Sequence, residues 1–196
     1  NSFSVYDNEL RTLHSYNKIN LVPFGEFLPF ENFLRKFGIK SLTNNYHSFS
    51  KGFQRNIIEI NKENLSLKIL PLICYEIIYS GKLFNYPDFD LIINLSEDGW
   101  FGKSIGPKQH FVHSIFRAIE SGKYILRSSN NGIAGIINPV GYIEQRVNFG
   151  KSGYIDFKSM KKIQPTIFSL YGNKIFLLVI LLYIVMIFLF NKTKNE

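Results

Sequence analysis

The sequence PLICYE, residues Pro71–Glu76, is the stretch around which the chain is organised, and it holds the only cysteine. The segment 67–73 is almost wholly apolar, which predicts a buried strand. Such a strand would present the Cys74 thiol at its end, with the Glu76 carboxylate two residues later. A lone cysteine in apolar surroundings is more often an inert packed thiol than a nucleophile, so position alone leaves both interpretations open.

The nucleophile interpretation is favoured by a second stretch, KINLVPFGE at Lys18–Glu26. It offers an ammonium group and a carboxylate around a turn that contains proline and glycine. An ammonium group near Cys74 would favour the thiolate, and it could later hold an oxyanion. The two stretches together therefore predict a site for nucleophilic catalysis.

Further motifs follow in the chain, namely DGWFG at 98–102 and RSSNNG at 127–132. With KINLVPFGE and ICYE, in this order, they resemble the carbon–nitrogen hydrolase (nitrilase) superfamily, and within it the bacterial apolipoprotein N-acyltransferase family. The resemblance covers nearly the whole chain but only the C-terminal part of that enzyme. Any one motif alone is a weak signal, whereas the ordered combination is specific.

The resemblance implies an α/β fold: a nitrilase-like α-β-β-α sandwich, truncated at its N-terminus and followed by one C-terminal transmembrane helix. Residues 1–160 would form the partial nitrilase-like domain, 171–190 the transmembrane helix and 191–196 a short basic tail. The pattern of short strands alternating with helices also favours an α/β domain. It predicts a short helix or membrane-leaning loop at 27–37, a polar loop at 44–52, a helix at 109–122, and strands at 56–60, 65–73, 89–95, 124–127, 133–138 and 142–148.

The C-terminal segment is the clearest physical signal. Residues 175–190 carry no charge and nothing more polar than Tyr183, and Lys174 and Lys192 bracket them. Counted from Tyr171, the segment reaches the roughly 20 residues that a bilayer requires. A buried core helix is the alternative. It is disfavoured because this segment has no polar face that could meet water. Lysines flank the segment on both sides, so the resemblance decides orientation: it implies a catalytic domain in the periplasm, outside the bacterial inner membrane.

Composition and charge limit the classes of molecule that this chain is expected to bind. The 196 residues are 45% hydrophobic, and the formal charge is 23 − 15 = +8, half of it in the last 43 residues. Basic residues around an apolar segment favour anionic lipid headgroups over nucleic acid, and no nucleic-acid motif is present. The four histidines, the cysteine and the carboxylates show no metal-ligand spacing, so we expect no metal and no cofactor.

The resemblance also implies roles for individual residues. Cys74 would be the nucleophile and Lys18 the group that stabilises the tetrahedral oxyanion, with the backbone N–H of Tyr75 as a further donor. Glu26 matches a carboxylate expected to position Lys18 and the incoming amine. Tyr75 and Glu76 match positions that the family needs for activity.

For Trp100 and His110, a structural role is the alternative to a functional one. Trp100 and Phe101 lie in the glycine-flanked DGWFG loop and could line a substrate pocket, although a tryptophan that closes the edge of the core is as good an interpretation for Trp100. His110 matches a family position, and a hydrogen-bonded structural role is favoured for it over chemistry. Glu97 departs from the amide that the resembled family usually has at this position.

The implied reaction is a ping-pong transfer. Cys74 would take an acyl chain from a phospholipid as a thioester and give it to the α-amine of a diacylglyceryl-modified apolipoprotein. The family's general-base glutamate lies several dozen residues before the lysine, and only seventeen residues precede Lys18, with Glu9 too near to match. The N-terminal bundle of membrane helices is also absent. We therefore expect a fragment that is inactive alone and that works with an N-terminal segment of the same enzyme.

Two other functions compete with this hypothesis. The first is a nitrilase-type amidase that the C-terminal helix tethers to the membrane, and the LVPFGE stretch and the apolar segment argue against it. The second is a non-catalytic remnant of a split gene, which folds and sits in the membrane without turnover.

Overall fold

The computed structural model describes residues 1–38, 48–62, 65–81 and 88–194. Its strands are β1 (Ser2–Tyr6), β2 (Thr12–Asn17), β3 (Ile58–Lys62), β4 (Leu65–Ile73), β5 (Leu91–Glu97), β6 (Tyr124–Asn130), β7 (Ala134–Ile137) and β8 (Ile143–Val147). Its helices are α1 (Glu31–Leu34), α2 (Gly106–Ser121), α3 (Ile167–Tyr171) and α4 (Lys174–Lys194). Short 3₁₀ turns form η1 (Arg35–Phe37), η2 (Cys74–Ile78) and η3 (Asp98–Phe101).

Most strands fall where the sequence predicts them. They form a six-stranded sheet of order β3-β4-β5-β6-β7-β8, in which β4, β5 and β6 are parallel and the other pairs antiparallel. β1 and β2 form a separate antiparallel hairpin. β6 runs to Asn130, three residues beyond the predicted end, because it stays paired with β5 to Glu97. In the predicted polar loop, residues 44–47 lie outside the described residues, and 48–52 have no regular structure.

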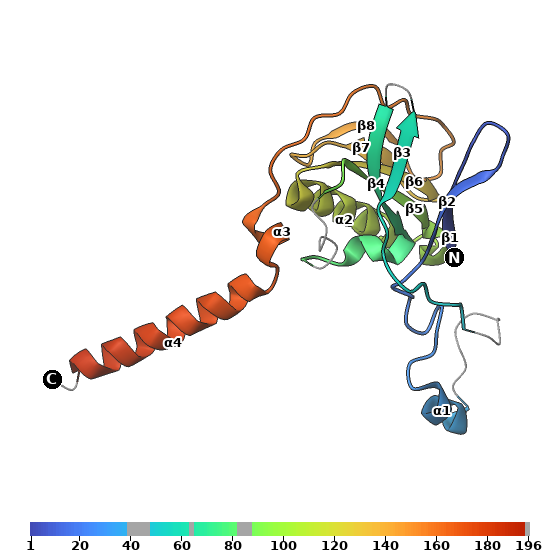
Figure 1. Ribbon diagram of the computed structural model, residues 1–196. Coiled ribbons are helices and arrows are strands. Elements are labelled where there is room, and N and C mark those ends of the chain that lie inside the picture. Colours follow the sequence, from blue (N-terminus) through green and yellow to red (C-terminus); the bar gives the residue numbers. More distant parts are fainter. Residues whose placement is uncertain (39–47, 63–64, 82–87, 195–196) are drawn as a thin grey trace.

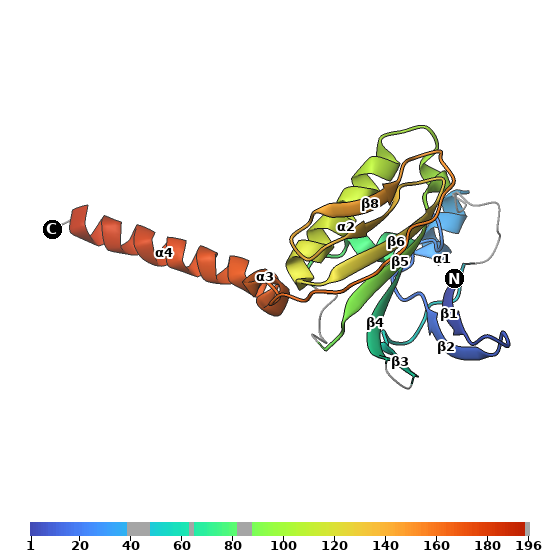
Figure 2. The same cartoon turned by 90° about the horizontal axis from the view of Figure 1, so that it is seen from above.

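The two faces of the large sheet carry two different apolar layers, because successive side chains of a strand point to opposite sides. One face packs against α2 and η2, through Leu70, Leu72, Ile92, Ile125 and Ile137 on the strands and Phe111 and Ala118 on α2. The other face packs against the β1–β2 hairpin, through Ile69, Leu91, Tyr124 and Ile136 on the sheet and Phe3 and Tyr16 on the hairpin. The helical layer, the sheet and the hairpin are visible in Figures 1 and 2, and the mixed sheet with its covering helices confirms the predicted α/β fold.

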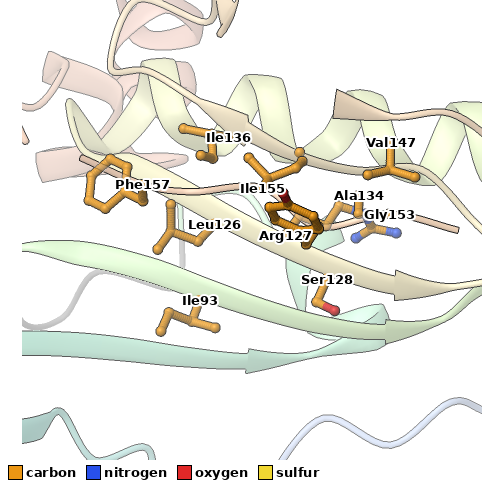
Figure 3. A pocket seen from close by; sticks show the side chains of 12 residues that line it. Ile93, Leu126, Arg127, Ser128, Ala134, Ile136, Val147, Gly153, Ile155 and Phe157 are labelled. Atoms are coloured by element: carbon orange, nitrogen blue, oxygen red, sulfur yellow. The ribbon is translucent and has the colours of Figure 1, made fainter. Parts of the chain in front are cut away.

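The chain after β8 returns across the hairpin side of the sheet. Ile155 and Phe157 of this segment pack near Ile93 of β5 and Leu126 of β6, and they leave a hollow of about 310 Å³ between them (Figure 3). The lining of the hollow is mostly apolar, with Arg127 and Ser128 at one end.

Helix α2 connects the large sheet to the C-terminal helices. It ends at Ser121, and the next residue, Gly122, has a φ of 66°, in the left-handed region that favours glycine after a helix C-terminus. Arg117 and Glu120, three residues apart on this helix, form an ion pair, with Arg117 Nη2 2.8 Å from Glu120 Oε2. The other carboxylate oxygen of Glu120 accepts from the Gly81 N–H at 2.7 Å, and its carbonyl accepts from the Thr166 N–H at 3.0 Å. Glu120 therefore ties the end of the Cys74 segment to the start of α3.

Helix α4 projects away from the sheet domain (Figures 1 and 2). It is long and apolar enough to cross a membrane by length and composition, and none of its Lys174–Asn191 segment is buried. Its 21 residues span about 30 Å at ~1.5 Å per residue, close to the thickness of a bilayer core. The helix begins at Lys174 rather than at Tyr171, because Gly172, with φ of 53°, separates it from α3.

Removing α4 should release the chain from membranes. A chain that ends at Tyr171 keeps α3 and its contact with Glu120, so we expect the domain to fold and to appear in the soluble fraction after carbonate extraction. The full chain should stay in the membrane pellet, because α4 has about 20 residues of apolar surface to bury. Equal partitioning of the two chains would contradict a membrane-spanning role for α4.

Candidate active site

Cys74 directly follows the carboxyl end of β4, where three parallel strands end side by side. Ile73 pairs with Leu95 of β5, and Leu95 pairs with Ser128 of β6, so the segments after all three strands meet at one sheet edge. Cys74 is half-buried, and its thiol donates to the Glu97 carbonyl oxygen at 3.9 Å. Its φ of 50° is left-handed, a conformation that costs a non-glycine residue about 1–2 kcal/mol.

The Glu76 carboxylate is fully buried and holds two distant segments together. Its Oε2 accepts from the Ile73 N–H at 2.9 Å, immediately before Cys74. Its Oε1 accepts from the N–H groups of Ile19 and Asn20, at 3.0 and 3.1 Å, immediately after Lys18. One side chain therefore fastens the segment that carries Lys18 to the segment that carries Cys74.

Two further side chains complete the surroundings of Glu76. The Tyr16 hydroxyl donates to Oε1 at 2.7 Å, and Arg55 Nη2 lies 3.2 Å from the same oxygen. Burial, and then the neighbouring Glu76 carboxylate, raise the pKa of the Tyr16 phenol, so Tyr16 stays a donor. Arg55 also donates to the Asn20 side-chain oxygen at 3.0 Å, which fixes the same loop from the other side.

Lys18 and Glu26 form an ion pair whose lysine is buried and whose glutamate is half-buried. Lys18 is fully buried, and its Nζ lies 2.8 Å from Glu26 Oε1. The second oxygen of Glu26 accepts from the Val22 N–H at 2.9 Å, which closes the VPFG turn between the two residues. The predicted partnership of Lys18 with Glu26 is thus present as a contact, and the pair is held by the loop that Glu76 anchors.

Behind Cys74 lies a second buried polar cluster, centred on Asp98. Its carboxylate receives Arg127 Nη2 at 2.8 and 3.0 Å, His110 Nδ1 at 2.8 Å and the Ser96 hydroxyl at 2.7 Å. Arg127 also donates to the Asn94 side-chain oxygen, and the Asn94 amide donates to the Leu72 carbonyl at 3.2 Å. Burial would raise the pKa of Asp98, but the His110 hydrogen bond and the Arg127 charge outweigh it and hold the pKa well below its ordinary value.

The DGWFG loop adjoins this cluster, because Asp98 is the first residue of the loop. Glu97 begins its 3₁₀ turn by accepting from the Gly99 N–H at 2.7 Å, and it receives the Asn130 side chain at 2.6 Å. Trp100 is 71% exposed, so the alternative in which it closes the edge of the core is wrong. The adjacent Asp98 side chain occupies the buried position of this turn instead. Phe101 is 40% exposed and packs one edge against the His110 ring, with centroids 5.5 Å apart.

Tyr75 is half-buried in η2, and its ring meets that of Tyr79 edge-on, with centroids 5.5 Å apart. Tyr16 and Arg55 were not singled out by the sequence analysis, and no spacing could have found them, because they approach Glu76 from 60 and 21 residues away. Asp98 and Arg127 stood inside quoted motifs, but their mutual pairing was not foreseen. Among the described residues, no group of three or more His, Cys, Asp and Glu side chains could hold a metal ion.

Comparison with known proteins agrees with this geometry. The carbon–nitrogen hydrolase family model matches residues 1–158. The chain is 39% identical over 192 residues to an apolipoprotein N-acyltransferase of Rickettsia prowazekii, which covers 97% of this chain and 38% of the relative. It is 38% identical over 176 residues to that of Rhodopseudomonas palustris, covering 88% of this chain and 32% of the relative. The chain thus spans about a third of the length of these relatives.

Among solved structures, an amidase from Nesterenkonia sp. AN1 superposes with a TM-score of 0.50 at 15% sequence identity, over 76% of this chain and 51% of the amidase. That structure carries the acetamide moiety of fluoroacetamide on its active-site cysteine. At this identity the likeness shows the fold alone. The family match over most of the chain, together with this fold, shows that the chain belongs to the carbon–nitrogen hydrolase family.

Proposed function

We propose that this chain is the cysteine-bearing part of an apolipoprotein N-acyltransferase. It would act at the bacterial inner membrane with its catalytic domain facing the periplasm. The acyl donor would be a phospholipid and the acceptor the N-terminal diacylglyceryl-cysteine of a lipoprotein. The relatives that share 38–39% of its residues carry this enzyme's name.

One observation carries the proposal: the Glu76 carboxylate joins the segment of the Lys18–Glu26 pair to the turn of Cys74. A thiol, an ammonium group and a carboxylate on segments fastened to each other form a set suited to covalent acyl transfer. Cys74 is the proposed nucleophile, and Lys18 and the Tyr75 N–H are the proposed oxyanion donors. Glu26 would hold Lys18 in place and receive the incoming amine.

The chemistry then takes two steps. The Cys74 thiolate forms a bond to the acyl carbonyl carbon, and the ester C–O bond breaks so that the lysophospholipid alkoxide leaves and takes up a proton. The acceptor amine next attacks the thioester, loses a proton and forms the amide, and the thiol is restored. Each step passes through a tetrahedral oxyanion, so the same donors would serve both.

Helix α4 favours an acyl donor drawn from a bilayer. Its apolar side chains are exposed along the whole helix, including Phe176, Leu182 and Phe188, and Tyr171 and Lys174 stand at its start. An amidase of small, freely soluble amides gains nothing from such an anchor. The membrane-tethered amidase is therefore the second candidate, and ammonia release from a small amide would identify it.

Proton removal needs a base that these 196 residues do not supply by motif. We propose that it is a glutamate in the part of the relatives that this chain does not span. A general base contributes about 10²–10⁴-fold to the rate, so the chain alone should show no turnover.

Replacing Cys74 by Ser or Ala should abolish the acyl-enzyme. With a labelled phospholipid in vesicles, and the missing part of the enzyme supplied, the unmodified chain should retain a hydroxylamine-sensitive label that both variants lack. Cys74→Ala should cost only about 1–2 kcal/mol of stability, so thermal unfolding will show that the loss is chemical. A label that persists in Cys74→Ala, which has no side-chain nucleophile at this position, would place the nucleophile elsewhere.

Transfer should depend on Lys18 once the rest of the enzyme is supplied. A chimera of the remaining part of the Rickettsia prowazekii relative with this chain should acylate a diacylglyceryl-cysteine peptide, as detected by mass spectrometry. Lys18→Met should lower the rate about 10²–10³-fold, the usual loss for an oxyanion donor. Lys51→Met, which removes a nearby exposed lysine, is the matched control and should leave the rate within about threefold.

Three outcomes would contradict the proposal. Robust transfer by the isolated 196-residue chain would mean that one of its own carboxylates acts as the base. A chimera that releases ammonia from small amides but acylates no peptide would identify the amidase. A folded chimera that does neither would indicate a non-catalytic remnant.

A further inference from the structure

His110 is a buried group that the proposed mechanism does not use, although it touches the backbone of Cys74. It lies on α2 and is 4% exposed, and its Nε2 lies 3.2 Å from the Cys74 carbonyl oxygen. A carbonyl oxygen can only accept a hydrogen bond, so Nε2 carries a proton and donates it. The contact joins the α2 layer directly to the residue with left-handed φ at the end of β4.

The other nitrogen of the imidazole ring also has a buried hydrogen-bond partner. Nδ1 lies 2.8 Å from Asp98 Oδ1, and Arg127 fixes the same carboxylate through two contacts. The Phe101 ring packs on the edge of the imidazole. His110 therefore cannot swing away from the Cys74 carbonyl without breaking its contact with the buried ion pair.

The consequence follows from the geometry of the peptide bond. In a planar trans peptide, the C=O of one residue and the N–H of the next point in opposite directions. Cys74 C=O and Tyr75 N–H belong to one such unit, and no peptide bond described in this chain is cis. A donor that fixes the direction of the carbonyl thus also fixes the direction of the Tyr75 N–H.

From this contact we infer that His110 is a positioning residue for the oxyanion site: by holding the Cys74 carbonyl, it aims the Tyr75 N–H at the oxygen that becomes negative. The inference rests on the proposed function, which makes the Tyr75 N–H an oxyanion donor. His110 touches no reacting atom and acts through the peptide. It should therefore affect the acylation of Cys74 more strongly than any reaction of the thiol that forms no oxyanion.

Two substitutions of His110 distinguish the role of its Nε2 contact from that of its Nδ1 contact. The amide nitrogen of glutamine can replace Nε2, so His110→Gln keeps a donor for the Cys74 carbonyl. The amide nitrogen of asparagine can replace Nδ1 only, so His110→Asn keeps the contact with Asp98 and leaves the carbonyl without its donor. His113→Asn changes the next histidine of the same helix, which is half-buried, and is the matched control.

Two reactions of Cys74 provide the readout in the full chain, held in detergent micelles. p-Nitrophenyl butyrate acylates the thiol in one turnover: the S–C bond forms, the ester C–O bond breaks, the thiol proton passes to solvent and p-nitrophenolate leaves without needing a general acid. Iodoacetamide alkylates the same thiol without forming an oxyanion. The ratio of the acylation rate to the alkylation rate therefore reports on the oxyanion site, because a general loss of structure would change both rates.

We expect His110→Asn to slow the p-nitrophenolate burst about 10²-fold, the lower range for loss of an oxyanion donor. His110→Gln should stay within about fivefold of the unmodified chain, and alkylation should stay within about threefold in every variant. A His110→Asn chain that keeps its burst, or that loses burst and alkylation equally, would overturn the inference. So would the absence of any burst from the unmodified chain. Failure of the chimera to transfer an acyl chain from phospholipid, with an intact burst and this ratio in the 196-residue chain, would instead contradict the proposed function and leave the role of His110 standing.

Discussion

The Glu76 carboxylate is the interaction on which the site depends. It is fully buried, and it accepts from the Tyr16 hydroxyl, from Arg55 and from backbone N–H groups on both sides of the site. A buried carboxylate without such partners costs several kcal/mol, and breaking a buried ion pair costs about 3–5 kcal/mol. The chain must therefore bring the loop after β2 against the turn after β4 in order to bury Glu76 at all.

The other parts of the site are arranged around this joint. The Lys18–Glu26 pair lies on the loop that Glu76 fastens, and the Asp98 cluster supports the Cys74 turn from the opposite side through His110. Glu120 then connects the end of the Cys74 segment to α3, and so to the membrane-spanning candidate α4. Each of these links is a carboxylate with backbone N–H or side-chain donors, and Glu76, Asp98 and Glu120 are buried, so polar contacts as well as apolar packing hold the segments together.

The sequence predicted the parts of this structure that depend on local pattern. The apolar run that ends at Cys74, the helix that precedes Gly122 and the apolar C-terminal segment are read from neighbouring residues, and each is present. The Lys18–Glu26 contact was also expected, because the family resemblance implies that Glu26 positions Lys18. What the sequence could not predict is the set of contacts between distant positions, such as Tyr16 with Glu76 or Asp98 with Arg127. These pairs depend on which strands are neighbours in the sheet, and hydrophobic periodicity does not encode the strand order.

Amide hydrogen exchange in a Glu76→Gln chain tests the central claim most directly. The glutamine amide group presents a donor where the carboxylate accepted, so the N–H groups of Ile19, Asn20 and Ile73 cannot all keep their acceptors. We expect their protection to fall together by at least about tenfold, or about 1.4 kcal/mol, while Ile92 and Ile125 in the sheet core keep theirs. Unchanged protection at the three amides, or an equal fall at Ile92 and Ile125, would contradict the claim that Glu76 joins the two segments into one site.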